Sequence, residues 1–555
     1  MSNPTTAHVW KQLQSLQSQI SNKRLTSLFE EDGDRFERFS LQAGNIFVDF
    51  SKNFIDGEIL DGLLELARHQ QLKEAINRLW SGHIVAPAMS AVPYMSLRDR
   101  AFLPMCIEGE DVSSSIRNAL YMLQRLCESI RSWSWRGYNG KPLTDVVTLG
   151  VGGSGNGAEM VCRALAPYHS PSIKSHFVAN ADAQAFRDKL SHLHPDTTLF
   201  IISSKSFTTQ ETLQNAHLAK SWIMGNAGTP DAMHQHFIAI TSNRCAAQEF
   251  GIREDNILPV WDWLPGRYSL WTTAGLPIAL SVGMERFEQL LDGAHQMDQH
   301  FVDAPLPQNL PVILGMLGVW YANFWNMPSH AILPYSELLE LLPGYLQHSL
   351  MEANGKSVDL QGKPVNYDTG PVIWGSAGTK NQHTYFQLLH QGTHVVPADF
   401  IVVATDATGN ETENASTFFH FLSQAETLMR GTENGQMQTI SSEQVLPGNK
   451  PSTSLLLSDL SPYTLGQLLA LYDHIAFVQS VIWNINPFSH WGTELGKRYA
   501  VMINSEGDDQ IAAQEHDSST RGLLEQYRRM QTLHRSQSRF NHGTMPPEES
   551  TYSVF

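Results

Sequence analysis

The sequence predicts an α/β protein with two units, each a mainly parallel sheet flanked by helices. From Asp145 to about Gly283, short β-branched runs alternate with helical patterns, which indicates a parallel sheet covered on both faces. These runs are 146–149, 176–178, 198–202 and 237–240. The second half repeats the pattern with longer helices, and its strand-like runs are 331–333, 372–374 and 400–403.

The segments before the first sheet are assigned from the same patterns. Val9–Leu28 has apolar residues at helical spacing, and 36–50 predicts strand segments broken at Gly44. A further helix is expected over Val112–Trp133. The turn cluster Gly137–Gly140 after it marks a boundary just before the first strand of the sheet.

Two later segments are predicted to lie outside the packed core. Residues 431–454 are rich in Gly, Gln, Asn, Ser and Pro, which indicates a long surface excursion. The segment from His534 to Phe555 is polar and contains proline, so a loosely held tail is expected.

Composition limits the class of protein. A chain of 555 residues with 42% hydrophobic and 17% charged residues should bury a large core in several packed units. The net charge of −17 repels polyanions, so we expect no nucleic-acid partner and no membrane partner. The four cysteines form no CxxC pair, which argues against a disulfide framework or a thiolate metal site; they are Cys106, Cys127, Cys162 and Cys245.

The sequence gives no indication of export. Its first residues lack a basic segment followed by an apolar run. The most apolar later stretch, Pro311–Trp325, is shorter than a membrane span of about 20 residues. Together with the cysteine usage, these features predict a cytoplasmic protein.

The first glycine-rich turn suits an anion. Gly150–Gly155 follows a predicted strand and matches GxGxxG, in which glycines let backbone amides approach a phosphate. A dinucleotide would also need an acid about 20 residues further on, and the candidate Asp182 lies late. Ser154 does not match a nucleophile elbow, because Asn156 stands where GxSxG needs glycine. A dinucleotide cofactor therefore remains the less favoured alternative.

The stretch Ser203–Glu211 is a stronger candidate for an anion site. It follows the strand at 198–202 and opens a helix, with hydroxyls at 204, 206, 208 and 209 beside Lys205. Hydroxyls, first-turn amides and a lysine suit a phosphate monoester dianion. An ordinary Ser/Thr helix cap is the alternative. Because GxxxxGK[ST] is absent, a nucleoside triphosphate is not indicated.

Three positions suit acid–base or electrostatic chemistry. Glu352 lies near the end of a predicted helix that stops at Asn354-Gly355, where the helix dipole should raise its pKa, as suits a general base. His383 is expected in the first turn of a helix, where the dipole keeps the imidazole neutral. Arg267 follows a Pro-Gly turn and suits a phosphate or an oxyanion. The alternatives are a solvated glutamate, a capping or core histidine and an arginine cap.

Metal binding is not expected, because HExxH is absent and the histidines are dispersed. Lys497 is, by default, a solvated helix residue.

Long segments of the chain resemble the phosphoglucose isomerase family. They are SSKSFTTQET, WDWLPGRYSLWTTAGLPIAL, ILPYSELLELLPGYLQHSLMEANGKSV, GPVIWGSAGTKNQHTYFQLLHQGT and NPFSHWGTELGKRYA. The resemblance implies two sugar-isomerase (SIS) domains and a homodimer with no metal or organic cofactor. It also implies interconversion of glucose 6-phosphate and fructose 6-phosphate, a reaction of glycolysis and gluconeogenesis.

Domain boundaries follow from the same resemblance. Residues 1–119 are the N-terminal helical part of the large domain, 120–283 the small SIS domain, and 284–510 the large SIS domain. Residues 511–555 are a C-terminal helix and the polar tail.

The resemblance also implies roles for individual residues. Glu352 matches the base that moves a proton between C2 and C1 through a cis-enediol(ate), and Arg267 matches the arginine that stabilises the anionic oxygen. His383 and Lys497 match the pair that opens the sugar ring, with the histidine delivered by the partner subunit in similar proteins. The phosphate loop and the first glycine turn of the family fall on Ser204, Lys205, Ser206, Thr209, Gly153 and Ser154.

Several positions depart from the family pattern near this site. His348 and His490 stand where the family has glutamines that contact substrate. An imidazole gains charge as the pH falls through about 6.5, so phosphate affinity should become pH dependent. Smaller departures are Gly155–Ala158 for Asp-Leu-Gly-Pro, Pro265 for glycine, and the lack of an arginine near Ser90.

The departures leave two alternatives to an active glucose-6-phosphate enzyme. One is a phosphosugar-binding or regulatory homologue with weak catalysis. The other is an isomerase of a different phosphorylated aldose.

Overall fold

The computed structural model describes residues 3–82, 92–107, 110–405, 411–432, 441–505 and 516–541. Its contacts divide the chain into two units, Met1–Ser489 and His490–Phe555, and each is described by itself. The departure noted near Ser90 lies outside the described residues.

The first sheet of the larger unit has five parallel strands in the order β6-β5-β7-β8-β9. Four of them contain the four predicted runs between Asp145 and Gly283, which confirms the predicted parallel sheet. The fifth, β9, was not predicted because it has only three residues. The strands are β5 (Asp145–Leu149), β6 (Lys174–Val178), β7 (Thr198–Ser203), β8 (Phe237–Thr241) and β9 (Ile257–Pro259).

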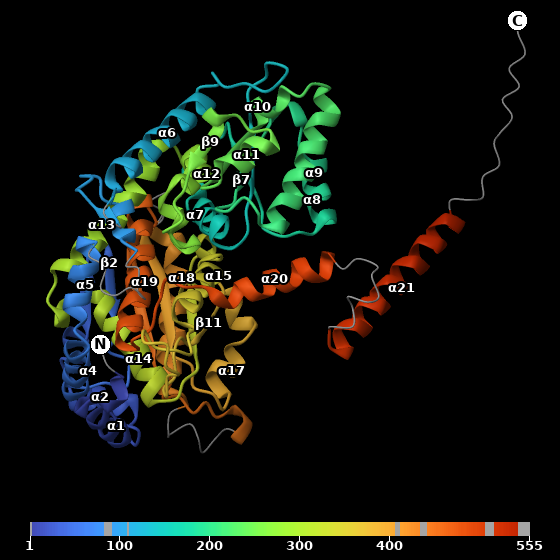
Figure 1. Ribbon diagram of the computed structural model, residues 1–555. Coiled ribbons are helices and arrows are strands. Elements are labelled where there is room, and N and C mark those ends of the chain that lie inside the picture. Colours follow the sequence, from blue (N-terminus) through green and yellow to red (C-terminus); the bar gives the residue numbers. More distant parts are fainter. Residues whose placement is uncertain are drawn as a thin grey trace, which may run out of the picture. The chain divides into compact units, whose positions relative to one another are not determined.

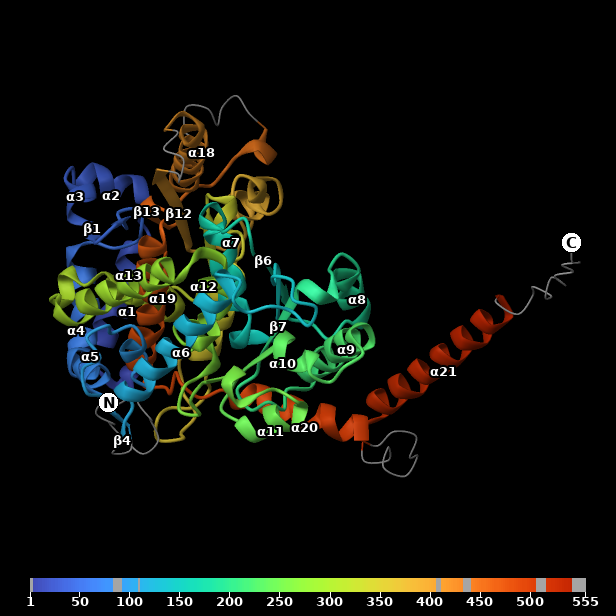
Figure 2. The same ribbon diagram turned by 90° about the horizontal axis from the view of Figure 1, so that it is seen from above.

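Helices cover both faces of this sheet. Successive side chains of a strand point to opposite faces, so neighbouring residues pack against different helices. Val147 and Phe200 pack in one core cluster, whereas Val146 and Ile201 belong to the other. One face is covered by α8 (Ala183–Ser191), α9 (Gln210–Ala227), α10 (Ala232–His236) and α11 (Arg244–Phe250). The other is covered by α6 (Ser113–Arg131), α7 (Asn156–Ala164) and α12 (Leu276–Val282), as Figures 1 and 2 show.

The second sheet has six strands in the order β1-β2-β13-β12-β10-β11 and is parallel from β13 to β11. The N-terminal hairpin β1–β2 adds two antiparallel strands at one end. It confirms the strand segments predicted over 36–50 except at their start, because Arg35–Arg38 form a short helix. The strands are β1 (Ser40–Ala43), β2 (Ile46–Asp49), β10 (Ser329–Pro334), β11 (Val372–Trp374), β12 (Ala398–Thr405) and β13 (Ser452–Asp459).

The predicted surface excursion at 431–454 is wrong at its end. β13 begins at Ser452, which is 1% exposed, and lies between β2 and β12. β13 was not predicted because it begins with the polar residues Ser452-Thr453-Ser454.

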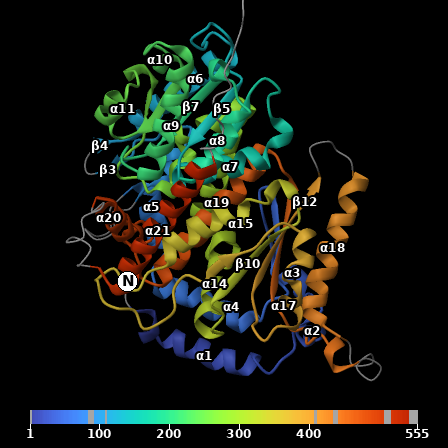
Figure 3. The ribbon, with the colours of Figure 1, turned by 90° about the vertical axis from the view of Figure 1, so that its right-hand side faces the viewer.

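This sheet is also covered on both faces. Ala331 and Phe400 pack against α17 (Phe386–Gln391) and α18 (Glu411–Arg430), whereas Ile332 and Ile401 face the main core. Figure 3 shows β10 and β12 between α14 and α18. The main core contains α1 (His8–Ile20), α4 (Gly57–His69), α13 (Met284–Asp303), α14 (Leu310–Phe324) and α19 (Pro462–Ile482).

Within the described residues, α19 is the one helix whose length and composition would allow it to cross a membrane, and all of its residues except Tyr463 are buried. It packs against α13 and α14 as a core helix. The apolar run of α19 is not evident in the sequence, because Gln467, Asp473, His474 and Gln479 interrupt it, and Pro311–Trp325 is the more continuous apolar stretch.

The remaining elements of the larger unit are short. The helix predicted over Val9–Leu28 is interrupted after α1, and α2 (Leu25–Glu31) follows. The others are α3 (Arg35–Arg38), α5 (Leu72–Ser81), β3 (Cys106–Ile107), β4 (Glu110–Asp111), α15 (Leu342–Leu346) and α16 (Glu352–Asn354).

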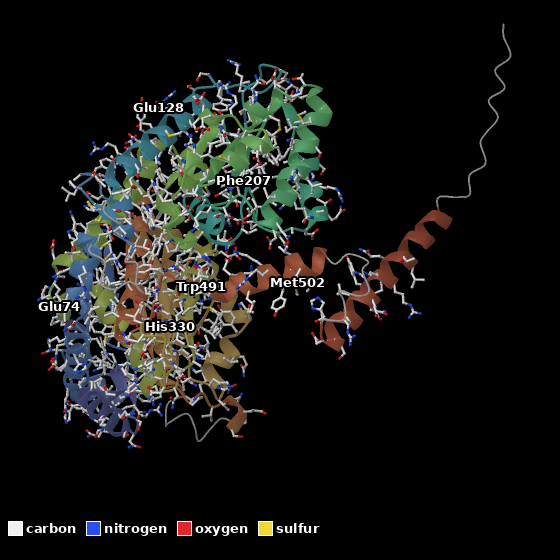
Figure 4. All side chains as sticks on the ribbon, in the orientation of Figure 1. Glu74, Glu128, Phe207, His330, Trp491 and Met502 are labelled. Atoms are coloured by element: carbon white, nitrogen blue, oxygen red, sulfur yellow. The ribbon has the colours of Figure 1, made fainter. Side chains whose placement is uncertain are left out.

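The smaller unit contains two helices, α20 (Trp491–Ser505) and α21 (Ser518–Asn541). Trp491, which begins α20, is labelled in Figure 4. The tail predicted from His534 is wrong for its first eight residues, because His534–Asn541 continue α21. Those residues contain neither glycine nor proline, which is why the helix can continue through them.

Candidate active site

The glycine turn and the Ser/Thr loop lie at the same edge of the first sheet. β5 and β7 are parallel neighbours, so the loops that follow their carboxyl ends lie side by side, where ligands bind in open α/β sheets. A Cβ atom at Gly150 would lie 3.1 Å from the carbonyl oxygen of Ser203. The structure thus brings the two predicted anion-binding segments together.

The Ser/Thr loop is held in shape by its own hydrogen bonds. The Ser204 hydroxyl donates to Thr209 Oγ1 at 3.3 Å, and the Lys205 ammonium donates to the carbonyl oxygen of Leu264 at 3.2 Å. Phe207, labelled in Figure 4, has a φ of 53° and a buried ring, and it turns the chain between Ser206 and Thr208. Ser206 and Thr208 are exposed at the tip of the loop.

The alternative of an ordinary helix cap is not favoured for this loop. Thr209 is the N-cap residue of α9, yet its side chain makes no capping hydrogen bond. The first amides of this 18-residue helix therefore have no side-chain cap, as an anion site requires.

Asp182, the candidate for binding the ribose of a dinucleotide, has a different role in the structure. Its side chain accepts hydrogen bonds from the backbone amides of Gln184 and Ala185 at 2.9 and 3.2 Å. Asp182 is therefore the N-cap of α8, which weighs against the dinucleotide alternative.

The glycine turn contacts the segment that carries Arg267. Gly152–Ser154 form a 3₁₀ turn after β5, and Gly266–Trp271 form another. A Cβ atom at Gly153 would lie 2.3 Å from the carbonyl carbon of Gly266 and 2.7 Å from the amide nitrogen of Arg267. Only glycine permits this approach, so Gly153 sets the distance between the two turns.

Replacing Gly153 by alanine is therefore expected to lower kcat/KM about 100-fold, because the new methyl group must displace the backbone beside Arg267. Steady-state kinetics on a phosphorylated sugar measure the effect. The matched control is Gly225→Ala in α9, where a Cβ atom meets nothing within 4 Å, and it should keep parental activity. Equal activity in Gly153→Ala and the parent would contradict this role of the glycine.

Glu352 is held from both sides of its carboxylate. Arg267 Nη1 donates to Glu352 Oε1 at 3.2 Å, and His348 Nε2 lies 3.2 Å from Glu352 Oε2. Glu352 begins the final short helix α16, after a π-helical turn at Gln347–Met351, so it lies in the last helical turn as predicted. The side chain is 19% exposed, which leaves the carboxylate accessible to a ligand.

His348 lies between Glu352 and the glycine turn. A Cβ atom at Gly152 would lie 3.9 Å from His348 Nε2. The predicted substrate contact of His348 stays a prediction, but its ring nitrogen lies against the Glu352 carboxylate as well.

Arg267 is a buried cation with a fixed orientation. Its side chain is 1% exposed, and its guanidinium lies 4.6 Å from the ring centre of Tyr268. A second guanidinium nitrogen donates to the carbonyl oxygen of Pro487. Burial acts to lower the pKa of Arg267, but the combined effect of Tyr268, Glu352 and Asp473 is larger, and the pKa is raised. The arginine is therefore charged at any working pH.

A buried ion cluster lies behind Arg267. Tyr268 stacks on Tyr94 at 4.4 Å, and Trp271 Nε1 donates to Asp473 at 3.3 Å. Arg98 binds both Asp298 and Asp473, and these three side chains are at most 3% exposed. The cluster thus supports the turn that positions Arg267.

The local structure predicted for His383 is wrong. The residue ends the short 3₁₀ turn Lys380–His383 instead of opening a helix, so the dipole argument for a neutral imidazole fails. The glycine-rich segment before it directs the chain into this turn. His383 is exposed, and its role in ring opening stays a prediction.

His490 and Lys497 belong to the smaller unit. Lys497 Nζ pairs with Glu494 at 2.9 Å, and His490 Nε2 lies 3.9 Å from the same carboxylate. Both residues are solvent-accessible, and their roles at the site stay predictions.

Lys356 was not among the predicted site residues. Its ammonium donates to the backbone carbonyl oxygen of Glu352. A lysine immediately after an Asn-Gly helix stop often binds the last carbonyl groups of a helix, and that signal was available in the sequence.

The fold and the site together define a sugar-phosphate isomerase of the α/β class. A hydroxyl-lined loop suits the phosphate, and a carboxylate beside a buried arginine suits proton transfer next to a carbonyl group. The model of the phosphoglucose isomerase family matches residues 49–524. The chain belongs to that family, which confirms the resemblance seen in the sequence.

Named relatives match over nearly the whole chain. The glucose-6-phosphate isomerase 1 of Chromohalobacter salexigens is 44% identical over 522 residues, which are 94% of each chain. The glucose-6-phosphate isomerase of Methylococcus capsulatus is 44% identical over 545 residues, with 95% of this chain and all of the relative covered.

A solved structure matches as well. The crystal structure of a glucose-6-phosphate isomerase from Chlamydia trachomatis has a TM-score of 0.82 and 26% identity, and it covers 95% of this chain and 100% of that chain. The predicted fold class is thereby confirmed.

Proposed function

We propose that this chain interconverts glucose 6-phosphate and fructose 6-phosphate as an aldose–ketose isomerase. The observation that carries the proposal is the Glu352 carboxylate, held between Arg267 and His348 next to a glycine turn that adjoins the Ser/Thr loop. The relatives that match over nearly the whole chain are named glucose-6-phosphate isomerases.

The phosphate group of the sugar would bind at the Ser/Thr loop. Ser204, Ser206 and Thr209 offer hydroxyl groups, and Lys205 offers a cation. Gly153 and Ser154 would approach the sugar from the glycine turn. This anchoring would fix the distance between the phosphate and the carbons that react at Glu352.

Glu352 would act as the base of the isomerisation. Its carboxylate removes the C2 proton of the open-chain aldose, and the electron pair forms a cis-enediol(ate) with negative charge on the carbonyl oxygen. The same carboxyl group then returns a proton at C1, while the hydroxyl group at C2 gives up its proton and the oxygen at C1 gains one, so that the ketose has its carbonyl group at C2 and a hydroxyl group at C1. Arg267 is charged throughout and stabilises the oxygen as its charge develops.

Ring opening would precede this step. His383 and Lys497 would move a proton between O1 and O5 of the cyclic sugar. In this proposal the protein is a homodimer, and the exposed His383 completes the site of the partner subunit. The route uses side chains alone, without a metal or an organic cofactor.

The setting of the enzyme follows from the reaction. We place it in the cytoplasm, in glycolysis and gluconeogenesis, with sugar phosphate as its partner and neither nucleic acid nor membrane. Its domains would be 1–119 with 284–510 as the large domain, 120–283 as the small domain and 511–555 as the C-terminal extension.

A coupled assay tests the activity. Purified protein is given fructose 6-phosphate, and glucose 6-phosphate is followed through its oxidation by a dehydrogenase. We expect turnover with this substrate and much slower turnover across a panel of other phosphorylated ketoses. A ligand-dependent rise in melting temperature without turnover would instead identify a phosphosugar-binding protein.

Lys205→Met is expected to raise the KM for fructose 6-phosphate about 10- to 100-fold with a smaller change in kcat, because the lost cation contacts the non-reacting phosphate. The competitive inhibition constant of inorganic phosphate should rise in parallel. Lys23→Met, on an exposed pair with Glu31, is the matched control and should change neither value. An unchanged KM in Lys205→Met would place the phosphate elsewhere.

A further inference from the structure

Lys356 occupies the end of the helix that carries the base. α16 ends at Asn354, and the last carbonyl groups of a helix have no partner within the helix. The Lys356 ammonium donates a hydrogen bond to the carbonyl oxygen of Glu352 itself. The lysine therefore binds the backbone of the catalytic residue.

The segment around Lys356 is fixed by neighbouring backbone. The Thr369 hydroxyl donates to the carbonyl oxygen of Lys356 at 2.7 Å. A Cβ atom at Gly370 would lie 2.8 Å from the carbonyl carbon of Asn354, so this loop packs directly on the helix end. Lys356 is thus not a freely moving surface lysine.

The ammonium also lies among the charges of the site. The charged groups that act on it are Arg267 and Glu352, and His348 lies against the far oxygen of the same carboxylate. Burial lowers the pKa of Lys356 to about 8, with Arg267 adding to the decrease and Glu352 opposing it. Lys356 is therefore mostly charged at neutral pH and loses that charge above pH 8.

We propose that Lys356 is a positioning residue for the isomerisation: its ammonium fixes the helix end at Glu352 and adds a second positive charge beside the carboxylate. Arg267 binds the side chain of Glu352, and Lys356 binds its backbone, so the two cations hold the base at two points. The inference rests on the proposed isomerase activity, because positioning has meaning only for a reacting base.

A purely structural helix cap would behave differently. A neutral amine can still donate a hydrogen bond to a carbonyl oxygen. If Lys356 were only a helix cap, kcat would therefore not change when the lysine loses its charge. If Lys356 acts as a positioning cation, kcat falls when the lysine loses its charge, because that charge favours the ionised form of the Glu352 carboxylate. The pH profile of kcat distinguishes the two.

The experiment compares Lys356→Met, which keeps the length without the charge, with Lys356→Arg, which keeps a charge at all working pH values. At pH 7.5 we expect Lys356→Met to lower kcat about 10- to 100-fold, with the KM for fructose 6-phosphate within about threefold of the parent. The parent should lose activity above about pH 8, whereas Lys356→Arg should keep its activity there.

The matched control is Lys363→Met, an exposed lysine seven positions further along the same segment, which should behave as the parent. Melting temperatures of all variants show whether each is folded at the assay temperature. If Lys356→Met does not fold, the alkaline limb of Lys356→Arg decides the question.

A parental kcat in Lys356→Met, or an alkaline limb that is identical in the parent and Lys356→Arg, would overturn the inference while leaving the proposed function intact. Absence of turnover in the parent itself would overturn the proposed function and this inference with it.

Discussion

Glu352→Gln is expected to lower kcat about 10²- to 10⁴-fold, because an amide cannot accept the proton that the proposed mechanism transfers from the sugar to this carboxylate. The change keeps the size of the side chain and an oxygen that can accept the hydrogen bond from Arg267. The KM for fructose 6-phosphate should stay within about threefold, since the Ser/Thr loop is untouched. The coupled assay measures both values.

A glutamate of the same region serves as the control for this change. Glu337→Gln alters an exposed side chain whose carboxylate lies 3.5 Å from Arg163, so parental kinetics are expected. Substantial turnover in Glu352→Gln, above about one tenth of the parental kcat, would mean that another group is the base.

Arg98→Met is expected to reduce the free energy of unfolding by about 3–5 kcal/mol, because it leaves the buried carboxylates of Asp298 and Asp473 without their cation. In the parent, Arg98 Nη2 lies 2.6 Å from Asp298 and Nη1 lies 2.9 Å from Asp473. Urea or thermal denaturation measures the loss. Activity should fall as well, since this cluster supports the turn that carries Arg267.

The loss of unfolding free energy in Arg98→Met should depend on pH. Burial raises the pKa of Asp473 to about 6 although Arg98 opposes the rise, so the folded protein binds this proton more tightly than the unfolded chain does. Asp473 therefore costs stability as the pH rises from about 4 to 6. Burial also lowers the pKa of His474 to about 4, and that group acts in the opposite direction. Without Arg98 the carboxylate penalty grows, so Arg98→Met should be closer to the parent at pH 5 than at pH 8.

The control for Arg98 is an exposed ion pair of the same kind. Arg68→Met breaks the pair with Glu65, whose side chains are about half exposed, and it should change stability by less than about 1 kcal/mol. Equal losses in Arg68→Met and Arg98→Met would contradict the importance of burial at the cluster.

The sequence predicted strands well where they were apolar and buried on both faces. The runs in β5, β7 and β8 contain only apolar residues and threonine, so their pattern is unambiguous. β13 begins with Ser452-Thr453-Ser454, and only its pairing with β2 and β12 makes a strand of these residues. Long-range pairing of this kind leaves no local signal.

The site was predictable where a residue type and its local setting agreed. Glu352 at a helix end and the hydroxyls after β7 carry their chemistry in the sequence, and the structure places them as expected. The contact between Gly153 and Gly266 joins segments more than one hundred residues apart, so spacing alone could not reveal it. The local conformation of His383 was also missed, because a glycine turn leads equally well into a 3₁₀ turn or a helix.

Isotope transfer tests the central role of Glu352 most directly. Glucose 6-phosphate labelled with deuterium at C2 is converted in ordinary water, and the label at C1 of fructose 6-phosphate is followed by NMR. A single carboxylate that carries the proton should return part of the label to C1 and lose the rest to water, and Glu352→Gln should do neither. Complete transfer with no loss to water at any temperature, or parental exchange in Glu352→Gln, would contradict proton transfer by this residue.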